Sequence, residues 1–167
     1  MLTLGIDPGL SGAVGALVDG VPFGFVDCPT VVTKVGKNTK RVSDATGMRQ
    51  ALIGFYLKHG QSQVHAQVFI EKVGAMPGQG VTSMFSFGVN YGMWQGVVTA
   101  LKFPLTFVTP QAWKKVMLAG TSKDKGASLL RARQLWPDQA EWFSRKKDEG
   151  RAEALLIAEY GRRLGAQ

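Results

Sequence analysis

One acidic residue in an apolar, glycine-rich stretch constrains this chain more than any other feature. Residues 4–15 contain a single carboxylate, Asp7. Asp is disfavoured in β-strands and is nearly always exposed unless it is paired, so an Asp that closes a short apolar run needs a hydrogen-bond donor or a cation. We interpret residues 2–7 as a central strand that ends in a functional acid. The alternative is a simple turn residue before Pro8-Gly9.

Further acids follow the same pattern downstream. Glu71 closes the apolar run 68–70, and residues 148–153 open a helix with three acids. Glu149 and Glu153 are four residues apart, so they share one helix face about 6 Å apart along the axis. Asp148 points about 100° away from Glu149 and competes as a ligand only if the helix starts later. Capping of the helix N-terminus is the alternative role of Asp148 and Glu149.

The acids and the net charge together indicate a metal site that faces a polyanion. Four carboxylates suit Mg²⁺ or Mn²⁺ and not zinc. Two such ions about 4 Å apart activate a water and stabilise the leaving oxygen of a phosphodiester. The chain has 20 basic and 12 acidic residues, a formal charge of +8, which favours a nucleic-acid partner over ordinary basic solubility. Its single cysteine, Cys28, excludes an internal disulfide.

The periodicity predicts an α/β fold in one domain, residues 1–167. Three antiparallel strands are expected at 2–7, 11–19 and 21–27, then a flexible basic loop at 30–43. Helices are expected from Ser43 or Asp44 to about residue 58, and at 82–101, 109–115, 122–136 and 148–164. Further strands at 66–72 and 104–108 complete a mixed five-stranded sheet flanked by helices. No membrane-spanning run and no export signal is visible, so we expect a cytoplasmic protein.

Small residues line one face of the expected helix at 82–101. They are spaced four apart, which allows another backbone to approach closely. This stripe predicts either a tightly packed helix or a dimer face, and it consists of Gly88, Gly92, Gly96 and Ala100.

These motifs resemble the RuvC-type Holliday junction resolvases of the RNase H-like superfamily, and most closely their bacteriophage and organellar branch. The resemblance rests on Ile6-Asp7-Pro8-Gly9 with Ser11-Gly12, on Ile70-Glu71-Lys72, and on Gly150-Arg151-Ala152-Glu153 followed by 154–158. Residues 75–80, 87–96 and 109–115 are similar to the same branch. The motifs span nearly the whole chain in the order found in the family.

The resemblance implies a homodimeric, divalent-metal-dependent endonuclease that makes paired nicks in four-way DNA and leaves a 5′-phosphate and a 3′-hydroxyl. Asp7, Glu71, Glu149 and Glu153 then take the positions of the four metal ligands, and Asp148 is the alternative for the third position. The expected contacts to DNA are Lys72, Met76, Lys114, Lys115, Lys123, Lys125, Arg145, Lys146, Lys147 and Arg151.

The chain departs from the family pattern at one position, and its residues leave two alternative functions open. Bacterial members carry an aromatic wedge three residues after the strand-end Glu, where this chain has Gly74, so Met76 or the 77–80 loop is the candidate substitute. The alternative functions are an RNase H-like nuclease that acts on RNA/DNA hybrids and a non-catalytic junction-binding protein. Intact acids at all four positions argue against the second.

Overall fold

A mixed five-stranded sheet forms the centre of the computed structural model, which describes residues 1–59, 66–74, 78, 80–121 and 126–165. The strand order is β3-β2-β1-β6-β7. The strands β1 to β3 are antiparallel neighbours, whereas β6 and β7 join β1 in parallel. The strands are β1 (Leu2–Asp7), β2 (Ala13–Val18), β3 (Val21–Asp27), β6 (Ala66–Glu71) and β7 (Leu105–Val108).

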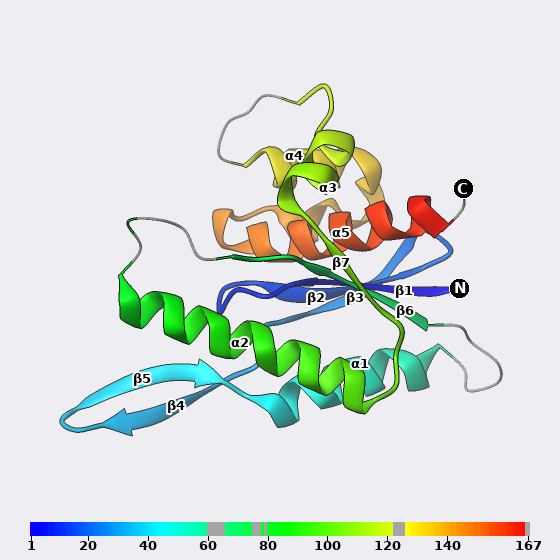
Figure 1. The fold of residues 1–167 in the computed structure, drawn as a ribbon. Helices are drawn as coiled ribbons and strands as arrows, with labels where there is room; N and C mark the ends of the chain where they lie inside the picture. Colours follow the sequence, from blue (N-terminus) through cyan, green and yellow to red (C-terminus); the bar gives the residue numbers. More distant parts are fainter. Residues whose placement is uncertain (60–65, 75–77, 79, 122–125, 166–167) are drawn as a thin grey trace.

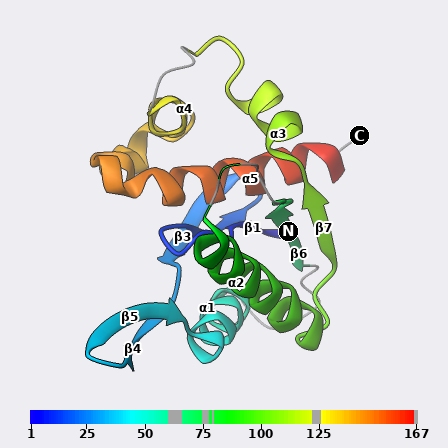
Figure 2. The same cartoon turned by 60° about the vertical axis from the view of Figure 1, so that its left-hand side comes forward.

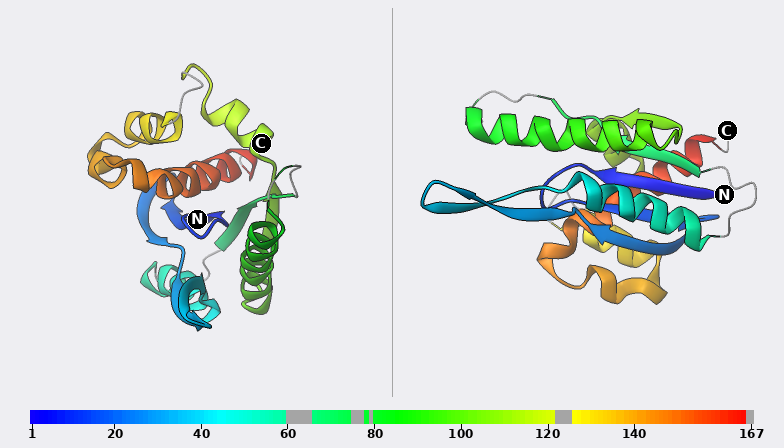
Figure 3. Two further views of the ribbon diagram at one scale, coloured as in Figure 1. Left: turned by 90° about the vertical axis from the view of Figure 1, so that its left-hand side faces the viewer. Right: turned by 90° about the horizontal axis from the view of Figure 1, so that it is seen from below.

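Helices cover both faces of this sheet (Figures 1 and 3). One face carries α1 (Ala45–Lys58) and α2 (Val81–Ala100). The opposite face carries α3 (Pro110–Met117), α4 (Ala127–Leu135) and α5 (Glu149–Gly165). Among the residues that the structure describes, no helix is long and apolar enough to cross a bilayer.

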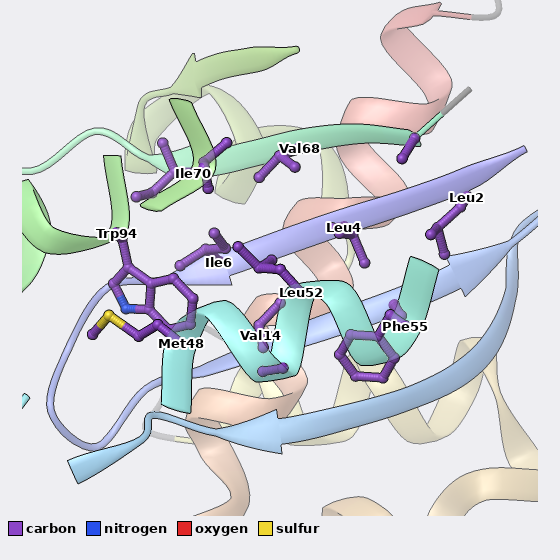
Figure 4. Close-up of a cluster of buried hydrophobic side chains, with 14 of the residues drawn as sticks. Leu2, Leu4, Ile6, Val14, Met48, Leu52, Phe55, Val68, Ile70 and Trp94 are labelled. Atoms are coloured by element: carbon purple, nitrogen blue, oxygen red, sulfur yellow. The ribbon is translucent and has the colours of Figure 1, made fainter. Parts of the chain in front are cut away.

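The core on the first face explains why β1 is almost wholly apolar. Leu2, Leu4 and Ile6 alternate toward α1 and α2 and are fully buried. Figure 4 shows them facing the apolar side of α1 and the indole of Trp94 from α2. The apolar burial that holds this strand also fixes where its last residue, Asp7, lies.

Two glycines let α5 lie directly against β1 and the turn that follows it. A Cβ atom at Gly5 would clash with the Ala154 carbonyl oxygen, and one at Gly150 would clash with the Ser11 carbonyl oxygen. Only glycine permits backbones to approach this closely. The first turn of α5 is therefore held beside the Asp7 turn.

The segment 30–43 is a β-hairpin, and the prediction of a flexible loop was wrong. Its strands are β4 (Thr30–Val35) and β5 (Asn38–Ser43), paired antiparallel around Gly36, which has a φ of 62°. β-branched residues favour strands, and a glycine at positive φ favours the tight turn between them. The hairpin projects away from the main sheet beside α1 and α2 (Figures 1 and 2).

Other elements agree with the sequence prediction or shift by a few residues. The three-strand meander, the two parallel strands and the helix capped by Asp44 are confirmed; the Asp44 carboxylate accepts a hydrogen bond from the Thr46 N–H. The helix expected at 122–136 is described from Ala127, and residues 122–125 lie outside the described residues. Two short 3-10 helices, η1 (Pro137–Phe143) and η2 (Lys146–Asp148), were not predicted, and the last helix begins at Glu149.

Candidate active site

Two acids lie at the carboxyl ends of neighbouring parallel strands, and therefore at the same end of the sheet. In the parallel pairing of β1 and β6, Ile6 lies opposite Ile70, so Asp7 and Glu71 follow side by side. The Asp7 carboxylate accepts a hydrogen bond from the Gly9 N–H at 3.2 Å. The carboxyl ends of parallel strands are where open α/β sheets place their functional sites.

The acids of α5 lie near the same end of the sheet, on the face that α5 covers. One carboxylate oxygen of Glu153 lies 3.1 Å from the Lys114 ammonium and accepts a hydrogen bond of 3.1 Å from the Ser128 hydroxyl. Glu153 and Glu149 both line a hollow together with Asp7, and the same two glutamates line a second hollow beside α3. The spacing of four residues thus puts both side chains on the face of α5 that looks toward Asp7.

The electrostatics show negative charge that is only partly compensated. Burial raises the pKa of Asp7 to about 7, and repulsion from Glu153 and Glu71 acts in the same direction against the hydrogen bond from Gly9. Burial also raises the pKa of Glu71. Burial disfavours the charged form of Lys114, but attraction to Glu153, Glu71 and Asp7 outweighs it and raises the pKa of that ammonium.

The donor set fits a hard divalent cation. The available ligands are carboxylate oxygens, which Mg²⁺ and Mn²⁺ prefer, and a cation would offset both the burial and the mutual repulsion that raise the pKa of Asp7. In the part of the chain that the structure describes, no three His, Cys, Asp or Glu side chains are gathered closely enough to hold a metal ion as they stand. The Lys114 ammonium supplies positive charge at Glu153.

Asp148 lies in a different environment from Glu149. Its carboxylate is only 1% exposed and forms ion pairs with Arg145 at 2.8 Å and with Arg151 at 3.0 Å. It also accepts the backbone N–H of Arg145, which caps η2. Hydrogen bonding to Arg145 lowers the pKa of Asp148. This carboxylate is already fully engaged by cations of the chain.

The predicted DNA-contacting residues fall into distinct groups. Lys146 and Lys147 are exposed and line the hollow that contains Asp7, Glu149 and Glu153. Arg151 is instead held by the Asp27 carboxylate at 2.6 Å, and its guanidinium lies 4.4 Å from the centre of the Phe25 ring.

The remaining predicted contacts are placed as follows. Arg145 pairs with Asp148, and Lys114 pairs with Glu153. Lys115 lines the hollow beside α3, and Lys72 is exposed directly after Glu71. Three of the predicted positions lie outside the described residues: Met76, Lys123 and Lys125.

Two residues of the site escaped the sequence prediction. Trp113, which is fully buried, donates its indole N–H to the Glu71 carboxylate at 2.8 Å, and Ser128 donates to Glu153. The run 109–115 was singled out as a motif, but only its lysines were given a role. A tryptophan next to a lysine in a helix usually indicates core packing. The sequence pattern at 109–115 therefore did not indicate the hydrogen bond from Trp113 to Glu71.

Comparison with solved structures identifies the architecture. The chain superposes on Thermus thermophilus RuvC in complex with a Holliday junction substrate with a TM-score of 0.59 and 16% identity, covering 99% of this chain and 96% of that chain. A second T. thermophilus RuvC structure gives a TM-score of 0.56 and 17% identity, with coverage of 99% and 97%. The chain has the RuvC fold. The predicted RNase H-like arrangement of strands and helices is therefore confirmed.

Sequence comparison adds a likeness to an organellar resolvase. The chloroplastic Holliday junction resolvase MOC1 of Chlamydomonas reinhardtii is 35% identical over 98 residues, or 59% of this chain. The aligned part is 11% of that protein, so the chain matches about a tenth of the length of this relative. No family model matches the chain. The resemblance to RuvC-type resolvases and their organellar branch, predicted from the motifs, is confirmed as a likeness.

Proposed function

We propose that this RuvC-fold protein is a metal-dependent endonuclease that resolves four-way DNA junctions by paired nicks. The observation that carries the proposal is the placement of Asp7, Glu71, Glu149 and Glu153 at one end of the sheet, next to exposed lysines. The relatives support the choice of substrate, since one is named as a Holliday junction resolvase and another was solved with a Holliday junction.

Each acid has a role in holding the cations. Asp7 and Glu71 supply oxygens from the sheet, and Glu149 and Glu153 supply oxygens from α5. We assign the third position to Glu149 because it lines the same hollow as Asp7, whereas Asp148 is bound by two arginines. Two Mg²⁺ or Mn²⁺ ions held by these residues would supply an activated water and would stabilise the leaving oxygen.

The chain itself binds and orients the DNA. Lys146 and Lys147 stand at the rim of the acidic hollow, and Lys115 lines the neighbouring hollow that shares Glu149 and Glu153. A DNA strand that follows these lysines passes over the acids. The charge of the lysines offsets the repulsion between the phosphates and the carboxylates.

The β4–β5 hairpin provides a second basic surface. Its side chains are largely exposed, and Arg41 donates to the Leu10 carbonyl oxygen at 3.1 Å, close to the Asp7 turn. A projecting arm with this charge suits the backbone of a DNA arm that leaves the site. Its basic residues are Lys34, Lys37, Lys40 and Arg41.

We further propose that two copies pair through α2. Val81 is 85% exposed and Phe85 is 74% exposed. Outside the local backbone of α2 itself, no atom of the described residues lies within 4 Å of a Cβ placed at Gly88, Gly92 or Gly96. These residues form one apolar, smooth stripe along the helix. A twofold dimer gives the two active sites that paired, symmetric nicks require.

The decisive experiment offers the purified protein three substrates: a synthetic four-way junction, a linear duplex and an RNA/DNA hybrid. Each is incubated with Mg²⁺, Mn²⁺ or EDTA. The proposal expects paired nicks in the junction alone, and only with a divalent cation. Preferential cleavage of the hybrid would support the RNase H-like alternative, and junction binding without cleavage in either metal would support the non-catalytic alternative.

The dimer is tested by its mass in sedimentation at micromolar concentration. We expect about twice the 18.0 kDa of one chain. Gly92→Arg should yield a monomer, since a long charged side chain would block the approach of a second helix. A monomeric wild-type protein would contradict the α2 dimer.

A further inference from the structure

A tryptophan holds one of the acids of the proposed site. Trp113 is fully buried in the core that α3 and α5 form with the sheet, a hydrophobic cluster that also contains Phe69, Met117 and Leu129. Its indole N–H donates a hydrogen bond of 2.8 Å to one carboxylate oxygen of Glu71, Oε1. Burial on all sides fixes the indole ring, so the donor points in one direction.

The chemistry of the indole suits it to this contact. The group donates one hydrogen bond and accepts none, so it always presents its N–H to the Glu71 oxygen. Its next residue, Lys114, places its ammonium 5.0 Å from the centre of the Trp113 ring and 3.1 Å from Glu153. Two successive residues of α3 therefore hold acids that come from two different elements.

We propose that Trp113 is a positioning residue, which fixes Glu71 Oε1 so that the second oxygen, Oε2, is presented to the divalent cation. The inference rests on the proposed function, because it takes Glu71 as a metal ligand. Partners that hold a ligand in this way typically change metal affinity by about 10–100-fold when they are lost. A tryptophan that served the core alone would leave the affinity unchanged.

Another tryptophan of the chain provides a matched control. Trp136 is also buried and also donates its indole N–H, but its acceptor is the Gly20 carbonyl oxygen at 3.2 Å. Gly20 lies beside Arg162 near the C-terminal end of α5, whereas Glu149 and Glu153 lie in the first two turns of that helix. Trp136→Phe therefore removes the same atoms and the same kind of hydrogen bond. It leaves Glu71 untouched.

The test measures Mn²⁺ affinity of the full chain by electron paramagnetic resonance, without DNA. Trp113→Phe should weaken binding about tenfold, whereas Trp136→Phe should not change it. In a Glu71→Gln background, which should itself weaken binding, Trp113→Phe should have no further effect, because Trp113 acts through Glu71. If Trp113→Phe does not fold, benzothienylalanine at position 113 replaces the N–H by sulfur and keeps the ring shape.

The outcomes separate this inference from the proposed function. The inference is overturned if Trp113→Phe binds Mn²⁺ as tightly as wild type, or if Trp136→Phe loses as much Mn²⁺ affinity as Trp113→Phe. It is also overturned if Trp113→Phe still weakens Mn²⁺ binding in the Glu71→Gln background, or if the wild-type protein binds no Mn²⁺. A protein that binds Mn²⁺ in a Trp113-dependent way but never cleaves a junction would refute the function and leave the positioning role in place.

Discussion

Asp148 and Glu149 are neighbours in the chain, yet they belong to two regions with opposite electrostatics. Asp148 joins Asp27, Arg145 and Arg151 in a network where each carboxylate meets a guanidinium within 3.0 Å. Glu149 faces the hollow that it shares with Asp7 and Glu153. The pKa of Asp148 is lowered by its hydrogen bonds to Arg145, whereas that of Asp7 is raised by burial and by repulsion from other acids.

This contrast separates acids that are neutralised by arginines of the fold from acids that we propose as metal ligands. The arginine-bound network ties the end of β3 to the start of α5, and it fixes the direction in which α5 leaves η2. Among the described residues, the acids around Asp7 form no ion pair of this kind, apart from that of Glu153 with Lys114. Substitutions should therefore affect stability in the first region and metal-dependent chemistry in the second.

The largest expected effect is loss of cleavage in Asp7→Asn. The amide keeps the shape of the side chain but removes one negative charge from the proposed metal site. We expect cleavage of a four-way junction to fall by more than about 100-fold, beyond the usual loss of an indirect partner. Junction binding, measured by gel shift in Ca²⁺, should remain, and its loss would indicate that Asp7 supports the fold.

The same variant should be more stable than wild type in EDTA at alkaline pH. A pKa raised to about 7 means that the folded metal-free protein loses stability as pH rises from about 4 to 7, because the buried carboxylate must ionise. At about 1.4 kcal/mol per pKa unit, the cost above pH 7 is at most about 4 kcal/mol. Thermal melts at pH 5 and pH 8 check this, and a gain that is equal at both pH values would argue against it.

Asp148→Asn and Glu149→Gln should have opposite effects on stability and on metal-dependent cleavage. Removing the Asp148 charge leaves Arg145 and Arg151 without their shared partner, so we expect a loss of about 2–3 kcal/mol in the free energy of unfolding. Glu149→Gln should leave stability within about 0.5 kcal/mol, as at most surface positions, and should lower cleavage and Mn²⁺ affinity. Urea unfolding and Mn²⁺ titration of both variants give the measurement.

Acid titration provides a further check on this pair. Because the pKa of Asp148 is lowered on folding, its stabilisation is present above the ordinary value near 3.8 and is lost as pH falls through the lower folded value. The wild-type advantage over Asp148→Asn in unfolding free energy should thus be complete at pH 6 and shrink below pH 4. A greater loss of Mn²⁺ affinity in Asp148→Asn than in Glu149→Gln, at equal stability, would instead make Asp148 the ligand.

The sequence predicted the sheet well because its signals are local. Apolar runs that end at Asp7 and Glu71 mark adjacent strands, and the turn at Asp19-Gly20 marks the hairpin between β2 and β3. The hairpin at 30–43 was missed because its lysines and Asn38 suggested a solvated loop, although Val31 and Val32 favour a strand.

The candidate site was predictable only in part, because pairing between distant side chains leaves no local pattern. The spacing of Glu149 and Glu153 indicated one helix face, and the structure places both beside Asp7. The hydrogen bond that Arg151 donates to Asp27 spans 124 residues, so no local pattern indicated that Arg151 should be withdrawn from the expected DNA contacts. The same holds for the bond between Trp113 and Glu71.

The smallest expected effect concerns the exposed lysines next to the arginine-bound network, Lys146 and Lys147. The double variant Lys146→Ala, Lys147→Ala should weaken junction binding about tenfold. It should also remove about two phosphate contacts, and each lost contact lowers the slope of log affinity against log salt concentration by about 0.9. Stability should not change, since both side chains are exposed. Arg49→Ala with Lys58→Ala removes the same charge from α1, on the opposite face of the sheet, and should leave the slope nearly intact. If both double variants lower affinity equally, net charge alone governs binding, and the lysines at the acidic hollow have no local role in guiding the DNA strand.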